Sequence, residues 1–228
     1  MQTKRLNMII SHIDAKTVAD IGTDHAYIPV QLALGKVADK VIATDLNKGP
    51  LDAARSNVKV NGCGNVVECR LGSGLTPIGV GECGTIVIAG MGGELISEIL
   101  KEGEAVAKAA DKLLLQPMNS QDTLRRFLLE NGYEITDEDL TVEGFKVYNL
   151  IIAQKGNMAC PSDEFEYHLP ERLYKHKHFG ALLAKKKREF GKILSGLERA
   201  TERNDEEIKR YKNLLERVVR LEEEYAGF

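Results

Sequence analysis

One segment near the amino terminus constrains the fold of this chain more than any other. Residues 18–27 form the run Val-Ala-Asp-Ile-Gly-Thr-Asp-His-Ala-Tyr, and a second apolar run over 41–44 ends at Asp45. This order predicts a strand, a tight polar turn, a helix and a second strand. A parallel α/β sheet holds an adenosine in this way, because the turn offers backbone N–H groups and the acid accepts hydrogen bonds from ribose hydroxyls. We therefore expect a nucleoside site around Asp20 and Asp45; the alternative is that they only cap a helix and end a strand.

The composition of the turn indicates the charge of its ligand. Asp24 stands where a G-x-G-x-G loop has its second glycine, and Ala26 stands where it has its third. The second glycine lets the backbone approach the pyrophosphate of a dinucleotide, and an anionic Asp24 would repel that group. A cationic ligand is favoured instead, and S-adenosylmethionine (SAM) carries a sulfonium and an ammonium without a phosphate. The turn thus favours methyl transfer over hydride transfer.

Further β–α units follow, and their order indicates the architecture. Apolar runs predict five strands, at 17–21, 40–44, 66–71, 85–89 and 112–116. Ser120 is expected to be the N-cap of a helix at 121–131. Runs at 133–142 and 145–154 flank Glu143-Gly144 and predict a hairpin. Five β–α units and a hairpin predict the α/β fold of class I methyltransferases, a Rossmann-like, mostly parallel sheet with one antiparallel strand. We assign this domain to residues 1–158.

The composition changes after a glycine- and proline-containing linker near residues 155–163. Apolar residues then recur at three- and four-residue spacing over 179–197 and again over 208–221, on an otherwise charged background. Arg203-Asn204-Asp205 separates the two stripes as a turn with Asp205 as the capping acid. At about 1.5 Å per residue, two such helices form an antiparallel hairpin roughly 30 Å long. We expect a C-terminal coiled-coil hairpin over residues 165–228.

Charge and cysteine usage exclude several classes of protein. The net charge of −3 predicts no global attraction to nucleic acid, so a polyanion must meet a local basic patch. The four cysteines have neither C-x-x-C pairing nor zinc spacing, and His176 and His178 have no acidic or cysteine partners nearby in the sequence, so we expect no metal. No signal-peptide core or membrane-spanning run occurs in the sequence, and we expect a cytoplasmic protein. A monomer is favoured.

Cationic residues concentrate in one part of the tail. They are candidates for RNA phosphate contacts, together with a pair in the helix after the fifth strand: Lys175, Lys177, Lys185, Lys186, Lys187, Arg188, Arg125 and Arg126. The alternative is that these charges form solvated helix faces, as most charge runs do.

Three motifs together resemble one enzyme family. They are residues 19–27 (Ala-Asp-Ile-Gly-Thr-Asp-His-Ala-Tyr), 88–93 (Ile-Ala-Gly-Met-Gly-Gly) and 115–117 (Leu-Gln-Pro). The chain resembles the bacterial tRNA (adenine-N1)-methyltransferases that act on adenine 22 of tRNA, and the resemblance extends over the helical tail, a two-helix coiled coil in that family. It implies a class I fold, SAM as methyl donor and N1 of a tRNA adenine as acceptor.

The resemblance also assigns roles to residues. It implies that Gly22 and its turn hold the methionine part of SAM and that Asp45 holds the ribose. The Gly72-Ser73 turn would approach the adenine ring, and Gly90, Met91 and Gly92 would lie beside the sulfonium. Thr23, Asp24, His25 and Leu46 complete the predicted donor site. Met118 stands where we expect an asparagine directly after Pro117, so the role of Asn119, a catalytic candidate, stays open.

The chemistry of the acceptor can be argued independently. Adenine N1 carries an uncharged, in-plane lone pair, so it can attack a sulfonium methyl without losing a proton. Alignment can contribute roughly 7–11 kcal/mol, more than the ~10²–10⁴ in rate that a general base supplies. N1 lies on the Watson–Crick edge, so the base must be unpaired or flipped. We expect Asp24 to stabilise the cationic product, with His25 and Tyr27 contacting the base. The alternative is that Asp24 only adopts a left-handed backbone.

The sequence lacks the residues that two other methyl-transfer reactions require. Gly92-Gly93 follow the fourth strand in place of the N-P-P-[YF] motif of amino-group methyltransferases, and no Pro-Cys follows that strand to attack a pyrimidine. Two alternatives stay open: a small-molecule methyltransferase, and a non-catalytic adaptor with a vestigial sheet and a coiled coil that recruits a partner.

Overall fold

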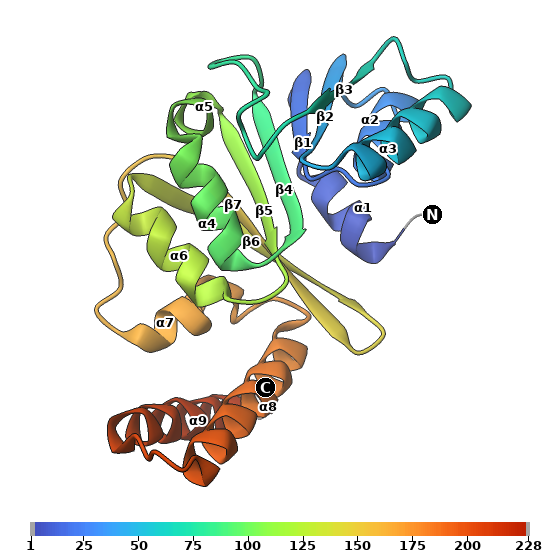
Figure 1. Ribbon diagram of the computed structural model, residues 1–228. Helices are drawn as coiled ribbons and strands as arrows, with labels where there is room; N and C mark the ends of the chain where they lie inside the picture. The colour runs from blue at the N-terminus through green and yellow to red at the C-terminus, as the bar shows by residue number, and fades with distance from the viewer. Residues whose placement is uncertain (1–2, 227–228) are drawn as a thin grey trace.

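A seven-stranded sheet in the order β3-β2-β1-β4-β5-β7-β6 forms the centre of the computed structural model, which describes residues 3–226 (Figure 1). Only β7 runs antiparallel to its neighbours, β5 and β6. The prediction of a mostly parallel sheet with one antiparallel strand is confirmed. The strands are β1 Thr17–Ile21, β2 Lys40–Asp45, β3 Val67–Leu71, β4 Thr85–Met91, β5 Lys112–Pro117, β6 Tyr133–Glu143 and β7 Lys146–Lys155.

Helices cover both faces of the sheet and bury its side chains. Along β4, Ile86 and Ile88 pack into one apolar cluster and Val87 packs into the other, which explains the continuous apolar run of this strand. One face is covered by α1 (Lys4–Ser11), α2 (Tyr27–Leu34) and α3 (Lys48–Val60). The other is covered by α4 (Gly93–Glu102), α5 (Glu104–Ala109) and α6 (Gln121–Glu130).

The C-terminal residues form a helical arm that projects from the sheet domain (Figure 1). It comprises α7 (Glu164–His168), a 3-10 turn at Glu171–Leu173, α8 (Phe179–Arg199) and α9 (Asp205–Ala226). Its apolar core also contains Leu140 and Val147 from the β6–β7 hairpin. The outer half of the hairpin therefore packs with the arm, although both strands belong to the sheet.

Three local predictions were wrong. Ser120 precedes α6, but its backbone is left-handed (φ 49°) and its side chain makes no capping bond. The fourth strand does not end at Ala89, because it extends through Gly90 and Met91 with an irregularity in its pairing with β5. Asp205 is the first residue of α9, and Asn204 caps the helix by accepting a hydrogen bond from the Glu207 N–H at 3.1 Å.

The described part of the chain also bears on membranes and metals. None of the helices within residues 3–226 combines the length and the apolar character that crossing a membrane requires. Within the same residues, no cluster of three or more His, Cys, Asp or Glu side chains could hold a metal ion. All four cysteines are free thiols.

Candidate active site

A pocket of about 270 Å³ opens at the carboxyl ends of β1 and β4. Ligands of doubly wound α/β proteins bind at this edge of the sheet. The pocket is lined by residues of α1, the end of β1, the β1–α2 turn, α2 and the end of β4: Arg5, Leu6, Asp20, Gly22, Thr23, Asp24, Tyr27, Ile28, Ala89 and Gly90. Six residues of the predicted site therefore line one cavity. Five come from the segment 18–27, and the sixth is Gly90.

Asp20 places a buried carboxylate in the wall of the pocket. Its Oδ2 accepts a hydrogen bond from the Thr23 hydroxyl at 2.6 Å. Burial raises the pKa of Asp20 to about 6, against the opposing effects of the Thr23 hydrogen bond and the charge of Arg5. A carboxylate held away from water gains most from a cation placed beside it. The pocket is therefore suited to a positively charged ligand.

The turn after β1 depends on left-handed backbone at three residues: Gly22 (φ 71°), Asp24 (φ 50°) and Ala26 (φ 54°). The N–H groups of Gly22 and Thr23 both donate to the carbonyl of Thr44 at the end of β2, at 2.9 and 2.8 Å. A Cβ added to Gly22 would lie 2.1 Å from the Met91 methyl group. The turn thus places Gly22 against Met91, which is not one of the residues that line the pocket.

Asp45 lies where the sequence predicts it, at the end of β2. Its Oδ1 accepts from the Asn47 N–H at 2.8 Å, and its Oδ2 lies 3.4 Å from the Asp24 N–H. The neighbouring Leu46 is exposed, and the Gly72 N–H donates to the Asp45 carbonyl at 3.0 Å, with Ser73 next to it. Asp45, Leu46, Gly72 and Ser73 therefore form one rim beside the pocket.

Arg5 is the one charged residue among the four lining residues of the pocket that the sequence analysis missed; the others are Leu6, Ile28 and Ala89. It lies on α1, and its Nη1 donates to Gln116 Oε1 at the end of β5 at 2.9 Å. Its guanidinium carbon lies 5.8 Å from the centroid of the Tyr148 ring, and a Cβ added to Gly90 would be 3.2 Å from Nη1. A cation therefore stands opposite the carboxylates of the pocket. The sequence shows only an amphipathic helix here.

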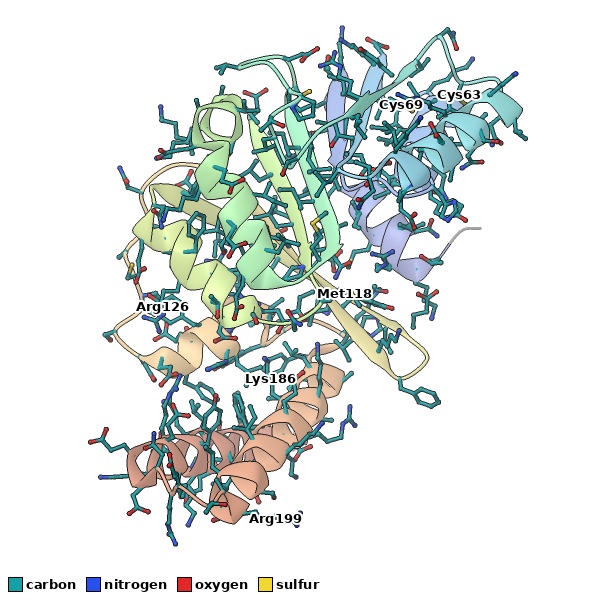
Figure 2. All side chains as sticks on the ribbon, viewed as in Figure 1. Cys63, Cys69, Met118, Arg126, Lys186 and Arg199 are labelled. Carbon is teal, nitrogen blue, oxygen red and sulfur yellow. The ribbon has the colours of Figure 1, made fainter. Side chains whose placement is uncertain are left out.

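Gly92 and Gly93 let two loops approach each other closely. Met118 donates to the Met91 carbonyl at 2.8 Å, and Gly93 donates to the Asn119 carbonyl at 3.1 Å. A Cβ on Gly93 would lie 2.1 Å from the Ser120 carbonyl oxygen, and one on Gly92 would lie 2.9 Å from Asn119 Oδ1. The side chain of Met118 is exposed at this edge (Figure 2). The two glycines thus have a packing role, and Asn119 lies over Gly92.

Three predicted catalytic side chains are exposed next to one another: Asp24 and Tyr27 line the pocket, and His25 lies beside them. His25 Nε2 is 3.7 Å from Asp24 Oδ1, and the rings of His25 and Tyr27 are 5.5 Å apart. The carbonyl of His25 accepts from Asn57 Nδ2 at 2.7 Å. Asp24, His25 and Tyr27 are therefore held together, whereas Asn119 belongs to the loop after β5.

Two of the predicted RNA-binding residues are buried, and the prediction was wrong for them. Arg125 pairs with buried Glu138 and donates to the Tyr167 carbonyl at 2.6 Å. Lys186 lies against Gln121 (3.4 Å) and Glu189 (3.0 Å) at the base of the arm (Figure 2). Neither can meet a phosphate there, because each cation is enclosed by protein.

The other predicted cations differ in their surroundings. Lys185 is partly buried and donates to the Val147 carbonyl at 3.3 Å, and burial lowers its pKa. Arg126 stacks on the Tyr167 ring at 4.3 Å, and Lys187 pairs with Glu222 at 2.6 Å. The side chains of Lys175, Lys177 and Arg188 are exposed.

The sheet order, the two faces of helices and the pocket at the β1 turn define a methyltransferase domain. Residues 2–151 match the family described as "Methyltransferase domain". The chain belongs to the family of the tRNA (adenine(22)-N(1))-methyltransferases. It is 35% identical over 162 residues to the Bacillus subtilis protein of that name, an alignment covering 71% of this chain and 68% of the relative.

Solved structures agree with this membership over almost the whole chain. The B. subtilis m1A22 tRNA methyltransferase TrmK has a TM-score of 0.84 and 29% identity, covering 97% of this chain and 99% of that one. M. capricolum TrmK, solved with S-adenosylhomocysteine (SAH), has a TM-score of 0.78 and 25% identity, covering 99% of this chain and 98% of that one. The similarity therefore includes the helical arm.

Proposed function

We propose that this protein transfers a methyl group from SAM to N1 of adenine 22 in tRNA, the reaction for which its B. subtilis relative is named. The observation that carries the proposal is the buried Asp20 carboxylate beside the left-handed Gly22 turn, in a pocket at the carboxyl edge of the sheet. This is a site for a cationic nucleoside, which SAM is and a dinucleotide is not.

The residues of the pocket fit the parts of SAM. Asp20 would face its ammonium, Arg5 its carboxylate, and Asp45 the ribose hydroxyls. The rim at Gly72 and Ser73 would hold the adenine, and Gly90 to Gly92 would lie beside the sulfonium. When bound there, SAM supplies an electrophilic methyl group on a positively charged sulfur.

The acceptor would enter at the mouth formed by Asp24, His25 and Tyr27. The N1 lone pair forms the new N–CH₃ bond while the S–CH₃ bond breaks and its electron pair stays on sulfur, so no proton needs removal. The two rings can hold an unpaired adenine against the pocket. The Asp24 carboxylate stabilises the positive charge that develops on the adenine ring.

The arm supports binding of a large RNA. Arg188, Lys192 and Arg199 are exposed on α8 at spacings of one and two turns, which places them on one face of the helix, and Lys175 and Lys177 are exposed just before it. α8 is attached at the same edge of the sheet as the pocket, since Lys186 contacts Gln121 at the start of α6. We propose that these exposed cations meet tRNA phosphates while the base reaches the pocket.

Nucleoside analysis tests the function directly. The protein is incubated with unmodified tRNA and methyl-labelled SAM, and the RNA is then digested to nucleosides. We expect 1-methyladenosine from the normal transcript and none from a transcript with guanine at position 22. A different methylated nucleoside, or no product with active donor binding, would refute the proposal.

Reversing the exposed charges of α8 should weaken tRNA binding. In the triple variant Arg188→Glu, Lys192→Glu, Arg199→Glu we expect KM for tRNA to rise at least about tenfold and the slope of log KM against log salt to flatten, because each lost phosphate contact removes about one unit of slope. The matched control is Lys101→Glu, an exposed residue at the far end of α4. An unchanged salt slope in the triple variant would exclude α8 as the phosphate contact.

Donor affinity should depend on pH through Asp20. The pKa of Asp20 is raised from 3.8 to about 6 in the folded protein, so folding favours the protonated form of this acid. The protonated acid therefore contributes to the free energy of unfolding below pH 3.8, and this contribution is lost as the pH rises through about 6. The ammonium of SAH favours the ionised form, so the affinity for SAH should rise about tenfold in total between pH 5 and pH 7, with its midpoint near pH 6. Calorimetry should show this rise in the wild type and a weak, pH-independent affinity in Asp20→Asn. An unchanged slope in Asp20→Asn would assign the titration to another group.

A further inference from the structure

The short helix α7 lies between the sheet domain and the arm, and it is fixed on its domain side. Arg125 donates to the Tyr167 carbonyl at 2.6 Å while Glu138 neutralises its guanidinium. Arg126 covers the ring of the same tyrosine at 4.3 Å. Asp163 caps the helix by accepting from the Phe165 N–H at 3.0 Å. α7 is thus attached to α6 and β6 of the sheet domain.

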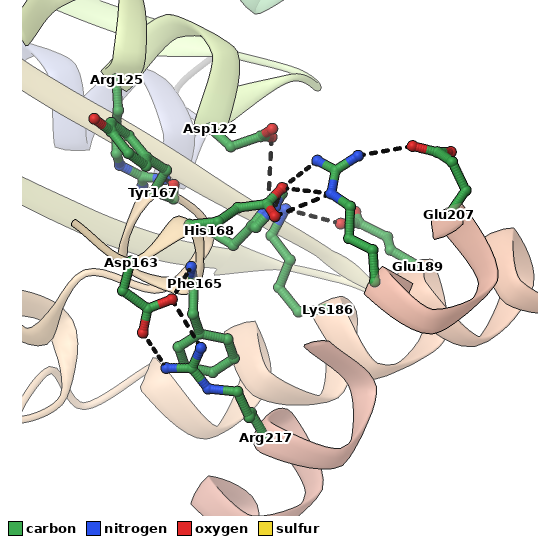
Figure 3. A network of polar contacts seen from close by, with 12 residues as sticks. Asp122, Arg125, Asp163, Phe165, Tyr167, His168, Lys186, Glu189, Glu207 and Arg217 are labelled. Atoms are coloured by element: carbon green, nitrogen blue, oxygen red, sulfur yellow. Dashed lines mark hydrogen bonds and ion pairs between the residues drawn. The ribbon is translucent and has the colours of Figure 1, made fainter. Parts of the chain in front are cut away.

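The other side of α7 holds α9 by two ion pairs (Figure 3). Asp163 accepts two hydrogen bonds from Arg217, one of them at 2.8 Å, and the Arg217 guanidinium also lies 4.1 Å from the centroid of the Phe165 ring. Glu164 accepts from Arg210 Nε at 2.8 and 3.0 Å. Arg210 and Arg217 are two turns apart on α9 and therefore lie on one face of that helix. The carboxylates of Asp163, the N-cap of α7, and of Glu164, its first residue, both bind this face.

A buried polar layer lies between α7 and α8, next to the ion pairs of Asp163 and Glu164. We call these contacts around α7 together the joint. His168 of α7 packs edge-on against Phe190 at 5.0 Å, with Asp122 at 3.5 Å and Glu164 at 3.7 Å from its ring nitrogens. Burial lowers the pKa of His168, so the ring is held neutral there. Polar and charged groups therefore connect α6, α7, α8 and α9 at one place (Figure 3).

We infer that this joint fixes the direction of the arm relative to the pocket, and that Asp163, Glu164, Arg210 and Arg217 are positioning residues for methylation. The inference rests on the proposed function, in which the arm holds tRNA and the pocket holds SAM. When an RNA is bound along the arm, its adenine reaches the pocket only if the arm points in one direction relative to the sheet domain. A displacement of about 1 Å at the reacting atoms can reduce rate by about 10²-fold. The two arginines of α9 therefore orient the arm and do not meet RNA.

The test replaces the two carboxylates without disturbing the helix cap. The double variant Asp163→Asn, Glu164→Gln keeps a good N-cap at 163 and the side-chain shapes, but removes both negative charges. The matched control is Glu207→Gln, because Glu207 pairs with Arg210 within α9 itself at 2.9 Å and does not reach α7. The charge-swapped pair Glu164→Arg, Arg210→Glu leaves the Asp163 cap in place and should restore that ion pair in reverse.

Two measurements are made on each variant. The first is kcat/KM for tRNA alongside the Kd of SAH. The second is the distance between spin labels at Ser195→Cys and Lys101→Cys in a Cys69→Ser, Cys160→Ser background, which removes the two native thiols that are not buried. We expect the double variant to broaden the distance distribution and to lose about tenfold or more in kcat/KM, with the SAH Kd unchanged. Glu207→Gln should match the wild type, and the charge swap should recover both properties in part.

Other results would overturn the inference. A distance distribution as narrow as that of the wild type in the double variant would show that the apolar core of the arm alone fixes its direction. A broadened distribution with unchanged kcat/KM would show that direction does not matter for the reaction. If the wild type forms no 1-methyladenosine, the proposed function fails, and the spin-label distances still test the joint.

Discussion

Gly93→Ala should destabilise the protein and weaken donor binding. The added Cβ would lie 2.1 Å from the Ser120 carbonyl oxygen and 3.1 Å from that of Asn119, and backbone atoms cannot rotate away as a side chain can. The 118–120 loop must move, which breaks the hydrogen bonds Met118 N–H to Met91 and Gly93 N–H to Asn119. Overpacking and two lost hydrogen bonds together cost about 2–4 kcal/mol, or roughly 5–15 °C in Tm for a chain of this length.

Thermal unfolding and calorimetry with SAH check this prediction. We expect the affinity for SAH to fall about tenfold, the equivalent of about 1.4 kcal/mol, because the displaced loop carries the end of β4 with it. Gly49→Ala is the matched control, since Gly49 also lies in the first turn of a helix and has nothing within 4 Å of an added Cβ. Gly92→Ala should be intermediate, because it meets only the Asn119 side chain. Equal effects of Gly93→Ala and Gly49→Ala would contradict the close approach as the cause.

The sequence predicted the sheet because each strand carries a strong local signal. The run at 85–89 is apolar throughout, as a strand covered on both faces requires, and glycine or proline marks most of the turns. The bounds of β1 were predicted to the residue. The helices α5 and α7 were missed, because six and five residues are too few to show a helical period.

Site residues were predictable from the sequence where they lie at the end of a strand that the sequence itself identifies. Asp20 lies near the end of the buried strand β1 and Gly22 follows that strand directly, so their place at the edge of the sheet depends only on the order of elements. Arg125 and Lys186 depend on partners that sequence cannot supply: Glu138 lies on a strand of the hairpin, and Gln121 lies 65 residues before Lys186. A cation that meets a carboxylate across the fold looks the same in the sequence as one that meets solvent. Arg5 was missed for the same reason, since only the packing of α1 brings it to Gln116.

Asp24→Asn should separate turnover from donor binding. Asparagine tolerates the left-handed backbone observed at Asp24 (φ 50°) nearly as well as aspartate does, so this change removes the charge and leaves the turn. If the carboxylate stabilises the cationic adenine, kcat should fall about 10²-fold, the usual effect of removing one group aimed at developing charge. The Kd of SAH should change much less, because we propose that Asp20 and Arg5, which this change leaves in place, pair with its charged ends.

The backbone role of Asp24 needs its own control, and Asp24→Gly and Asp24→Ala provide it. Glycine adopts the left-handed turn freely, whereas alanine is strained there by about 1–2 kcal/mol. If the carboxylate charge acts in the reaction, kcat should fall equally in Asp24→Asn and Asp24→Gly, and both variants should keep their affinity for SAH. Asp24→Ala should lose kcat and also lose affinity for SAH. Single-turnover methylation with saturating SAM, measured alongside the Kd of SAH, separates these outcomes. A parallel fall of kcat and affinity in Asp24→Asn would make Asp24 a donor-binding residue, and the positive charge on the product would then be stabilised elsewhere.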